Sequence, residues 1–71
     1  MSGAVLTGPE LAALRLLAGG LTHVQIAAEL GVRPETAGRL LHRARTVLRA
    51  RTLPHAVALA YEAGVLGHTG R

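Results

Sequence analysis

The sequence contains no cysteine, aspartate, asparagine or lysine, and its only serine, Ser2, stands at the start of the chain. Without cysteine, neither a disulfide nor a thiolate–metal site can form. The four histidines lack metal-ligand spacing, and no carboxylate pair, nucleophile–base pair or phosphate-cradling glycine-rich loop can be assembled from the remaining residues. We therefore expect no enzymatic activity, no metal and no cofactor, and no small-molecule ligand is indicated.

Aromatic residues are almost absent, since Phe and Trp are missing and Tyr61 is the only tyrosine. The core must therefore be built from Leu, Val, Ile and Ala, and the abundance of Ala and Leu favours helices over strands. The longest apolar runs are far shorter than the roughly 20 residues that span a bilayer, and no secretion signal is evident. We expect a cytoplasmic protein without a membrane partner.

Start and stop signals divide the chain into four helical segments. Capping-box patterns begin the first two, at Thr7 and Thr22, and glycines follow each of them. Pro34 begins a third segment that we expect to run to about residue 50, and a fourth extends from Thr52 to Gly64. The pattern predicts one all-α, four-helix domain over residues 6–66, with flexible ends at 1–5 and 67–71.

Positive charge is concentrated in one stretch of a chain whose net charge is +4. Between Thr36 and Tyr61 there are five arginines and two histidines but no acidic residue. An ordinary solvated helix face usually mixes both signs in i, i+4 pairs. The one-sided distribution is instead typical of a protein that binds nucleic acid.

The step from the second segment to the third has the spacing of a helix-turn-helix. Ala27 is small where the two helices must cross closely, and Gly31 can adopt the positive φ of the turn. Apolar residues in register would hold the two helices at a steep angle, so that the second can enter a major groove. They are Ile26, Leu30, Val32, Ala37 and Leu40. A generic αα-hairpin is the alternative, but it does not explain why arginine is concentrated on the third segment.

Residues along most of the chain resemble the DNA-binding domain of the LuxR/GerE family. The matching positions are Leu6-Thr7, Glu10, Leu14, Leu16, Ala18, Gly20, Ile26-Ala27, Leu30-Gly31-Val32, Thr36, Leu48, Ala56-Val57, Ala60 and Gly64-Val65-Leu66. The resemblance implies a bacterial transcription regulator whose third helix reads the major groove and whose fourth helix supports a dimer. Some members of the family consist of little more than this domain.

The resemblance and the charge pattern together predict which residues contact DNA and which form the dimer interface. We expect base contacts from Arg39, His42 and Gly38. We expect phosphate contacts from Thr22, His23, Arg33, Thr36, Arg43, Arg45 and Arg49. We expect the dimer interface to include Leu59, Tyr61 and Glu62.

The chain departs from the family at positions that bear on DNA recognition. Gly38 replaces a Lys that usually touches bases, Leu53 stands where Arg is usual, and Gln25 stands where Glu is usual. The target sequence therefore cannot be carried over from relatives.

Two alternatives to a LuxR-type DNA-binding domain involve protein partners. Residues 40–49 are also similar to the last helix of region four in extracytoplasmic-function sigma factors, whose partner is RNA polymerase. Against this, residues 54–66 continue into the additional helix of a LuxR-type domain. The other alternative is a protein-interaction module, either an adaptor that docks on RNA polymerase or an inhibitor that captures a larger regulator through the fourth helix.

Overall fold

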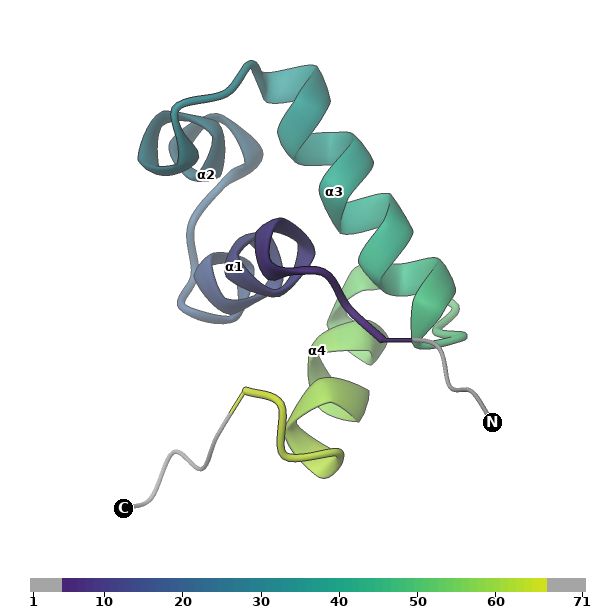
Figure 1. Ribbon diagram of the computed structural model, residues 1–71. Coiled ribbons are helices and arrows are strands. Elements are labelled where there is room, and N and C mark those ends of the chain that lie inside the picture. Colours follow the sequence, from purple (N-terminus) through teal and green to yellow (C-terminus); the bar gives the residue numbers. More distant parts are fainter. Residues whose placement is uncertain (1–4, 67–71) are drawn as a thin grey trace.

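The computed structural model describes residues 5–66, and within them helices joined by short connections are the only regular secondary structure, without strands. This part of the chain forms four helices, α1 (Gly8–Ala18), α2 (His23–Leu30), α3 (Pro34–Val47) and α4 (Leu53–Glu62), whose arrangement can be followed in Figure 1. The expected all-α architecture is confirmed. None of these helices combines the length and the apolar character needed to cross a bilayer. Val5 is exposed and non-helical, and the expectation of flexible ends stays a prediction there, while residues 1–4 and 67–71 lie outside the described residues.

Both predicted capping boxes are present. The Thr7 hydroxyl accepts a hydrogen bond from the Glu10 N–H at 3.3 Å, and the Glu10 carboxylate accepts one from the Thr7 N–H at 3.0 Å. Thr22 and Gln25 make the same reciprocal pair at 3.2 and 2.9 Å. Two otherwise unsatisfied backbone donors are thereby paired at the start of each helix, which fixes where α1 and α2 begin.

A three-residue connection reverses the chain between α2 and α3. Gly31 has φ +69° and ψ +33°, the left-handed conformation that the sequence predicts. The Val32 N–H donates to the Ala27 carbonyl at 3.0 Å, which closes the end of α2. Figure 1 shows α2 nearly end-on while α3 lies across the view, so the two helices cross steeply.

The end of α3 differs from the prediction, because the helix stops at Val47 and not near residue 50. Arg49 adopts φ +60°, and the Ala50 N–H bonds back to the Arg45 carbonyl at 2.9 Å. Each of the other three helices is followed by a glycine with positive φ, at Gly20, Gly31 and Gly64. No such glycine follows α3 in the sequence, so nothing local predicts the turn there.

Small residues dominate the core. Ten apolar residues are buried within residues 5–66, and of these only Leu14, Ile26 and Leu41 are larger than alanine. Alanine at the crossing points lets helix backbones approach closely, while larger side chains, among them Leu30, Val32 and Leu40, pack around them half-buried. Helices α1 and α3 each contact all three other helices, whereas α2 and α4 do not touch each other. The core is therefore organised around α1 and the buried side of α3.

We predict that replacing two glycines by alanine changes stability in opposite directions. Gly38 lies inside α3, and an added Cβ would make an ordinary 3.8 Å contact with His23 Cδ2, so Gly38→Ala should stabilise by about 0.5–1 kcal/mol. Gly31→Ala forces a Cβ into the left-handed region and should destabilise by about 1 kcal/mol or more. Thermal unfolding followed by circular dichroism checks both, since about 1 kcal/mol corresponds to a shift of roughly 4–8 °C in a domain of this size. Shifts of the same sign would contradict the assignment.

Candidate nucleic-acid interface

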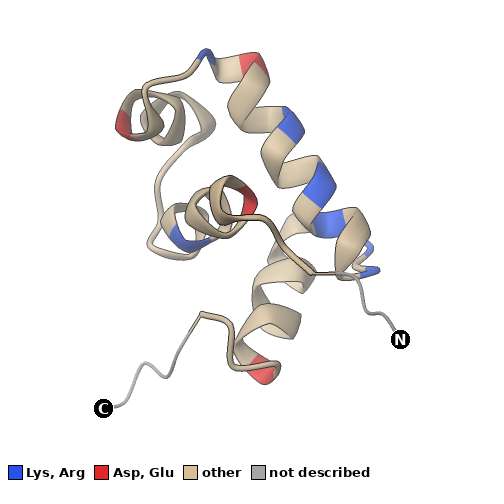
Figure 2. Cartoon of the chain, in the orientation of Figure 1, with Lys and Arg blue, Asp and Glu red and all other residues tan. Residues whose placement is uncertain are grey.

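The side of α3 opposite the core is exposed and carries the side chains expected to contact bases. Arg39 and His42 lie one helical turn apart on this side, and both are exposed. Helix spacing places Ala37, Leu41 and Ala44 on the buried side. Figure 2 shows that positive charge follows α3 along its length, with an acidic residue, Glu35, only at its start. The sequence pattern thus becomes one basic surface on one helix.

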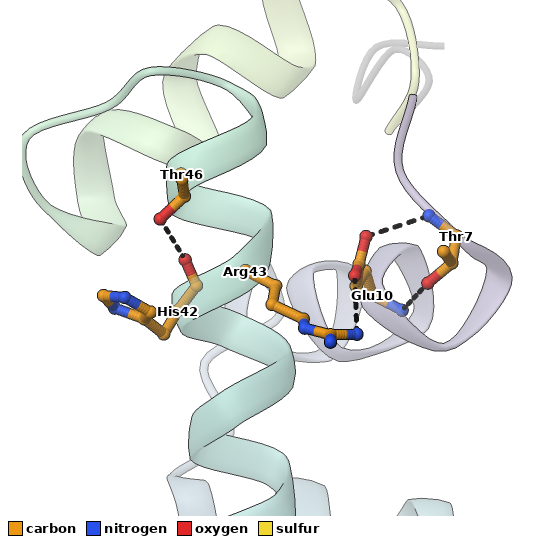
Figure 3. Close-up of polar contacts among 5 residues, drawn as sticks. All are labelled: Thr7, Glu10, His42, Arg43 and Thr46. Carbon is orange, nitrogen blue, oxygen red and sulfur yellow. Dashed lines mark hydrogen bonds and ion pairs between the residues drawn. The ribbon is translucent and has the colours of Figure 1, made fainter. Parts of the chain in front are cut away.

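Arg43 is exposed but reaches toward the start of α1. Its Nη1 lies 3.9 Å from Oε2 of Glu10, and the two side chains are 72% and 6% exposed respectively. Figure 3 shows Glu10 between Arg43 and Thr7, so one carboxylate both caps α1 and faces a cation from α3. With most of its side chain in solvent, Arg43 remains open to a further anion.

Arg45 makes polar contacts within the chain. Its Nη1 donates to the Ala50 carbonyl at 2.9 Å, and its Nη2 lies 3.3 Å from Nδ1 of His42. The residue is half-buried, unlike Arg39 and Arg43. Its expected phosphate contact stays a prediction, and these contacts hold its guanidinium at the end of α3.

His42 is held at both its backbone and its ring. Its carbonyl accepts a hydrogen bond from the Thr46 hydroxyl at 3.0 Å, and its Nδ1 faces Arg45. Figure 3 shows the imidazole directed away from α1, whereas the Arg43 side chain is directed toward it. The ring therefore projects from the basic surface in a defined orientation.

The start of α2 lies beside the first turns of α3. His23 reaches over Gly38, the predicted base-contact glycine, because a Cβ at that glycine would lie only 3.8 Å from Cδ2 of the His23 ring. His23 and Thr22 are exposed, and Thr22 keeps its hydroxyl proton free to donate because its oxygen serves as the cap acceptor. The N–H groups of the first helical turn add donors for an anion.

Two further arginines flank the exposed side of α3. Arg33 immediately precedes the helix and Arg49 lies in its closing turn, and both are exposed. Thr36 is half-buried and lines, with Arg39, Leu40 and Arg43, a shallow hollow of about 290 Å³ along the helix. The structure thus distributes the expected phosphate-contact residues around α3 and at the start of α2.

Two functional candidates are not predicted from the sequence. His55, at the start of α4, accepts a hydrogen bond from the Arg51 N–H through Nδ1 at 3.1 Å and is exposed. The sequence feature that could have indicated it is its position between Thr36 and Tyr61, where no acidic residue occurs. Glu10 is predicted only as a cap, and no local pattern indicates that Arg43, more than thirty residues away, would face it.

Helix α4 presents a weakly polar outer side. Tyr61 is half-buried and Glu62 is exposed, whereas Leu59 packs against the core cluster. Pro54 and Ala58 are also exposed. Beside them, α1 and α4 form an apolar hollow of about 500 Å³ lined by Leu17, Ala18, Leu53, Pro54 and Val57.

Residues 5–66 contain no group of three His, Asp or Glu side chains placed to hold a metal ion. Comparisons with protein-family models, with curated proteins and with solved structures find no match for this chain.

Proposed function

We propose that this chain binds duplex DNA sequence-specifically as a cytoplasmic bacterial transcription regulator, through a helix-turn-helix of the LuxR/GerE type formed by α2 and α3. The observation that carries the proposal is the exposed side of α3, which presents Arg39, His42 and Arg43 with no acidic residue after Glu35. A helix whose exposed side is basic, while its other side is packed against the domain, is what entry into a major groove requires.

The dimensions of the helix agree with this docking. A helix of 14 residues is about 21 Å long, and the major groove is about 12 Å wide. When α3 lies across the groove, Arg33 and Arg49 at its two ends fall near opposite phosphate backbones. The start of α2, with Thr22 and His23, adds donors to the same backbone.

We infer that some residues of the interface contact bases and others contact phosphates. Arg39 and His42, in the middle of the exposed side, contact base edges, and Gly38 lets the helix approach closely. The arginines at the margins, Arg43 and Arg49 among them, contact phosphates and therefore set affinity without setting sequence preference. Binding as a homodimer through α4 would place two copies of α3 in successive major grooves of a pseudo-palindrome.

An adaptor that docks on RNA polymerase or on another regulator is the second candidate. The apolar hollow between α1 and α4 favours it, because apolar surface suits a protein partner. The two functions differ in their salt dependence. Phosphate contacts release counterions, so the affinity of a DNA-binding protein for duplex DNA falls steeply as the salt concentration rises. An adaptor makes no phosphate contacts and should show no such salt dependence with duplex DNA.

We predict that Arg39→Ala and Arg43→Ala weaken DNA binding differently. Arg39→Ala should reduce the preference for a selected site over random duplex, by about 1–3 kcal/mol at the contacted base. Arg43→Ala should weaken binding to all duplexes alike and lower the salt slope by about 1. Binding is measured by fluorescence anisotropy across salt concentrations, on sites first selected from random DNA. Equal losses on specific and random duplex for both variants would refute the division, and no binding by the unaltered chain would refute the proposed function.

We predict that Arg49→Gly makes the protein more stable and a weaker DNA binder. Glycine removes the steric penalty of φ +60°, which should add about 1 kcal/mol to the free energy of unfolding. Loss of the charge removes a phosphate contact, so the salt slope should fall by about 1. Urea unfolding and anisotropy on the same preparation measure both. Arg51→Gly is the matched control, since Arg51 lies two residues away without a positive φ. Unchanged DNA affinity in Arg49→Gly would remove Arg49 from the interface.

We predict that Ala58→Glu weakens self-association. Ala58 is exposed on the outer side of α4, where a charge cannot be buried without a partner but does not disturb the core. Sedimentation analysis should show a dimer for the unaltered chain on its DNA site and a shift toward monomer for the variant. Ala28→Glu, an exposed alanine on α2, is the control for folding and size. A strict monomer both free and on DNA would exclude the dimer.

A further inference from the structure

We propose that Arg45 is a positioning residue that fixes the tautomer of His42, so that His42 presents only an Nε2–H donor to DNA and selects against cytosine. This rests on the proposed function and deepens it by naming the base chemistry that His42 reads. It also separates Arg45 from the arginines that meet phosphate.

The chemistry of the pair determines where the proton lies. A guanidinium carries five N–H donors and no acceptor, so Arg45 can only donate to the His42 ring. Nη2 of Arg45 lies 3.3 Å from Nδ1 of His42, which therefore acts as the acceptor and bears no hydrogen. In a neutral imidazole the hydrogen is then on Nε2.

The donor is itself held in place. Nη1 of Arg45 donates to the Ala50 carbonyl at 2.9 Å, in the turn that closes α3. The planar guanidinium thus donates to two acceptors, the Ala50 carbonyl and Nδ1 of His42. Arg45 is also half-buried, which limits the movement of its side chain. Thr46 fixes the backbone of His42 through its hydroxyl, at 3.0 Å (Figure 3). The ring is left with one outward-facing polar atom.

A ring with only an N–H to offer distinguishes bases by their acceptors. In the major groove guanine offers N7 and O6, adenine offers N7 and thymine offers O4, whereas cytosine presents only its amino donor. His42 facing cytosine would set donor against donor. The position that His42 contacts should therefore accept guanine, adenine or thymine and reject cytosine.

The tautomer is tested without DNA. At pH 8, long-range ¹H–¹⁵N correlation spectra show which ring nitrogen of His42 carries the hydrogen. The unaltered chain should show Nε2–H with Nδ1 as a hydrogen-bond acceptor. Arg45→Lys keeps the charge and a donor for Ala50 but loses the two-pronged geometry, so both tautomers should appear. A hydrogen on Nδ1 in the unaltered chain, or a His42 spectrum unchanged by Arg45→Lys, would overturn the proposal.

The base preference is tested on the selected site, with each of the four bases placed in turn at every position. The unaltered chain should disfavour cytosine by about tenfold at one position per half-site, and His42→Ala should lose this discrimination. Arg45→Lys keeps the positive charge and should lose this discrimination at the same position. Arg51→Lys is the matched control and should keep the discrimination.

The proposed DNA-binding function and the positioning role of Arg45 are contradicted by different results. A chain that binds no duplex at any salt concentration loses the proposed function and with it the base preference, while the spectra still decide whether Arg45 fixes His42. A chain that binds its site, but discriminates against cytosine equally well with Arg45→Lys, retains the proposed function and loses the positioning role. A merely structural role for Arg45 would lower the melting temperature without altering preference at that single position.

Discussion

The fold depends on how closely α3 approaches its neighbours. Ala37 and Ala44 are fully buried on either side of Leu41, and the alanines of the neighbouring helices complete the contact. Small side chains bring backbones together, and any larger residue at these positions would push α3 outward. Because α3 touches every other helix, fixing its buried side also fixes the direction of its opposite, basic side. The arrangement of the candidate interface is thus a consequence of core packing.

Local chemistry explains why so much of this fold could be predicted. The reciprocal caps at Thr7 and Thr22 and the left-handed Gly31 each act within a few residues, so their signals are contiguous in the sequence. The prediction for the end of α3 is wrong because an arginine occupies the left-handed position there, and arginine carries no such signal. Stabilisation of that turn comes partly from the Arg45 side chain, which periodicity cannot reveal.

The candidate interface was predictable in its composition but not in its internal contacts. The run of arginines without acidic residues, and helical spacing, were sufficient to place Arg39 and His42 together on an exposed side. The sequence could not indicate that Glu10 faces Arg43, since that pair joins α1 to α3 only after the helices have packed. Nor could it separate Arg45 from its neighbours, because the five arginines look alike until their side chains find acceptors.

Arginines that lie in solvent and arginines that are hydrogen-bonded within the chain are suited to different roles. An arginine in open solvent can turn toward a phosphate wherever the backbone of DNA lies, and it loses side-chain entropy only on binding. An arginine already bonded to a carbonyl and a ring nitrogen must break those bonds before it reaches a phosphate. Recognition of a base requires a donor held in one place, which a mobile side chain cannot supply. In the proposed complex, Arg39, Arg43 and Arg49 are therefore the arginines available to the nucleic acid, while Arg45 is held within the protein by Ala50 and His42.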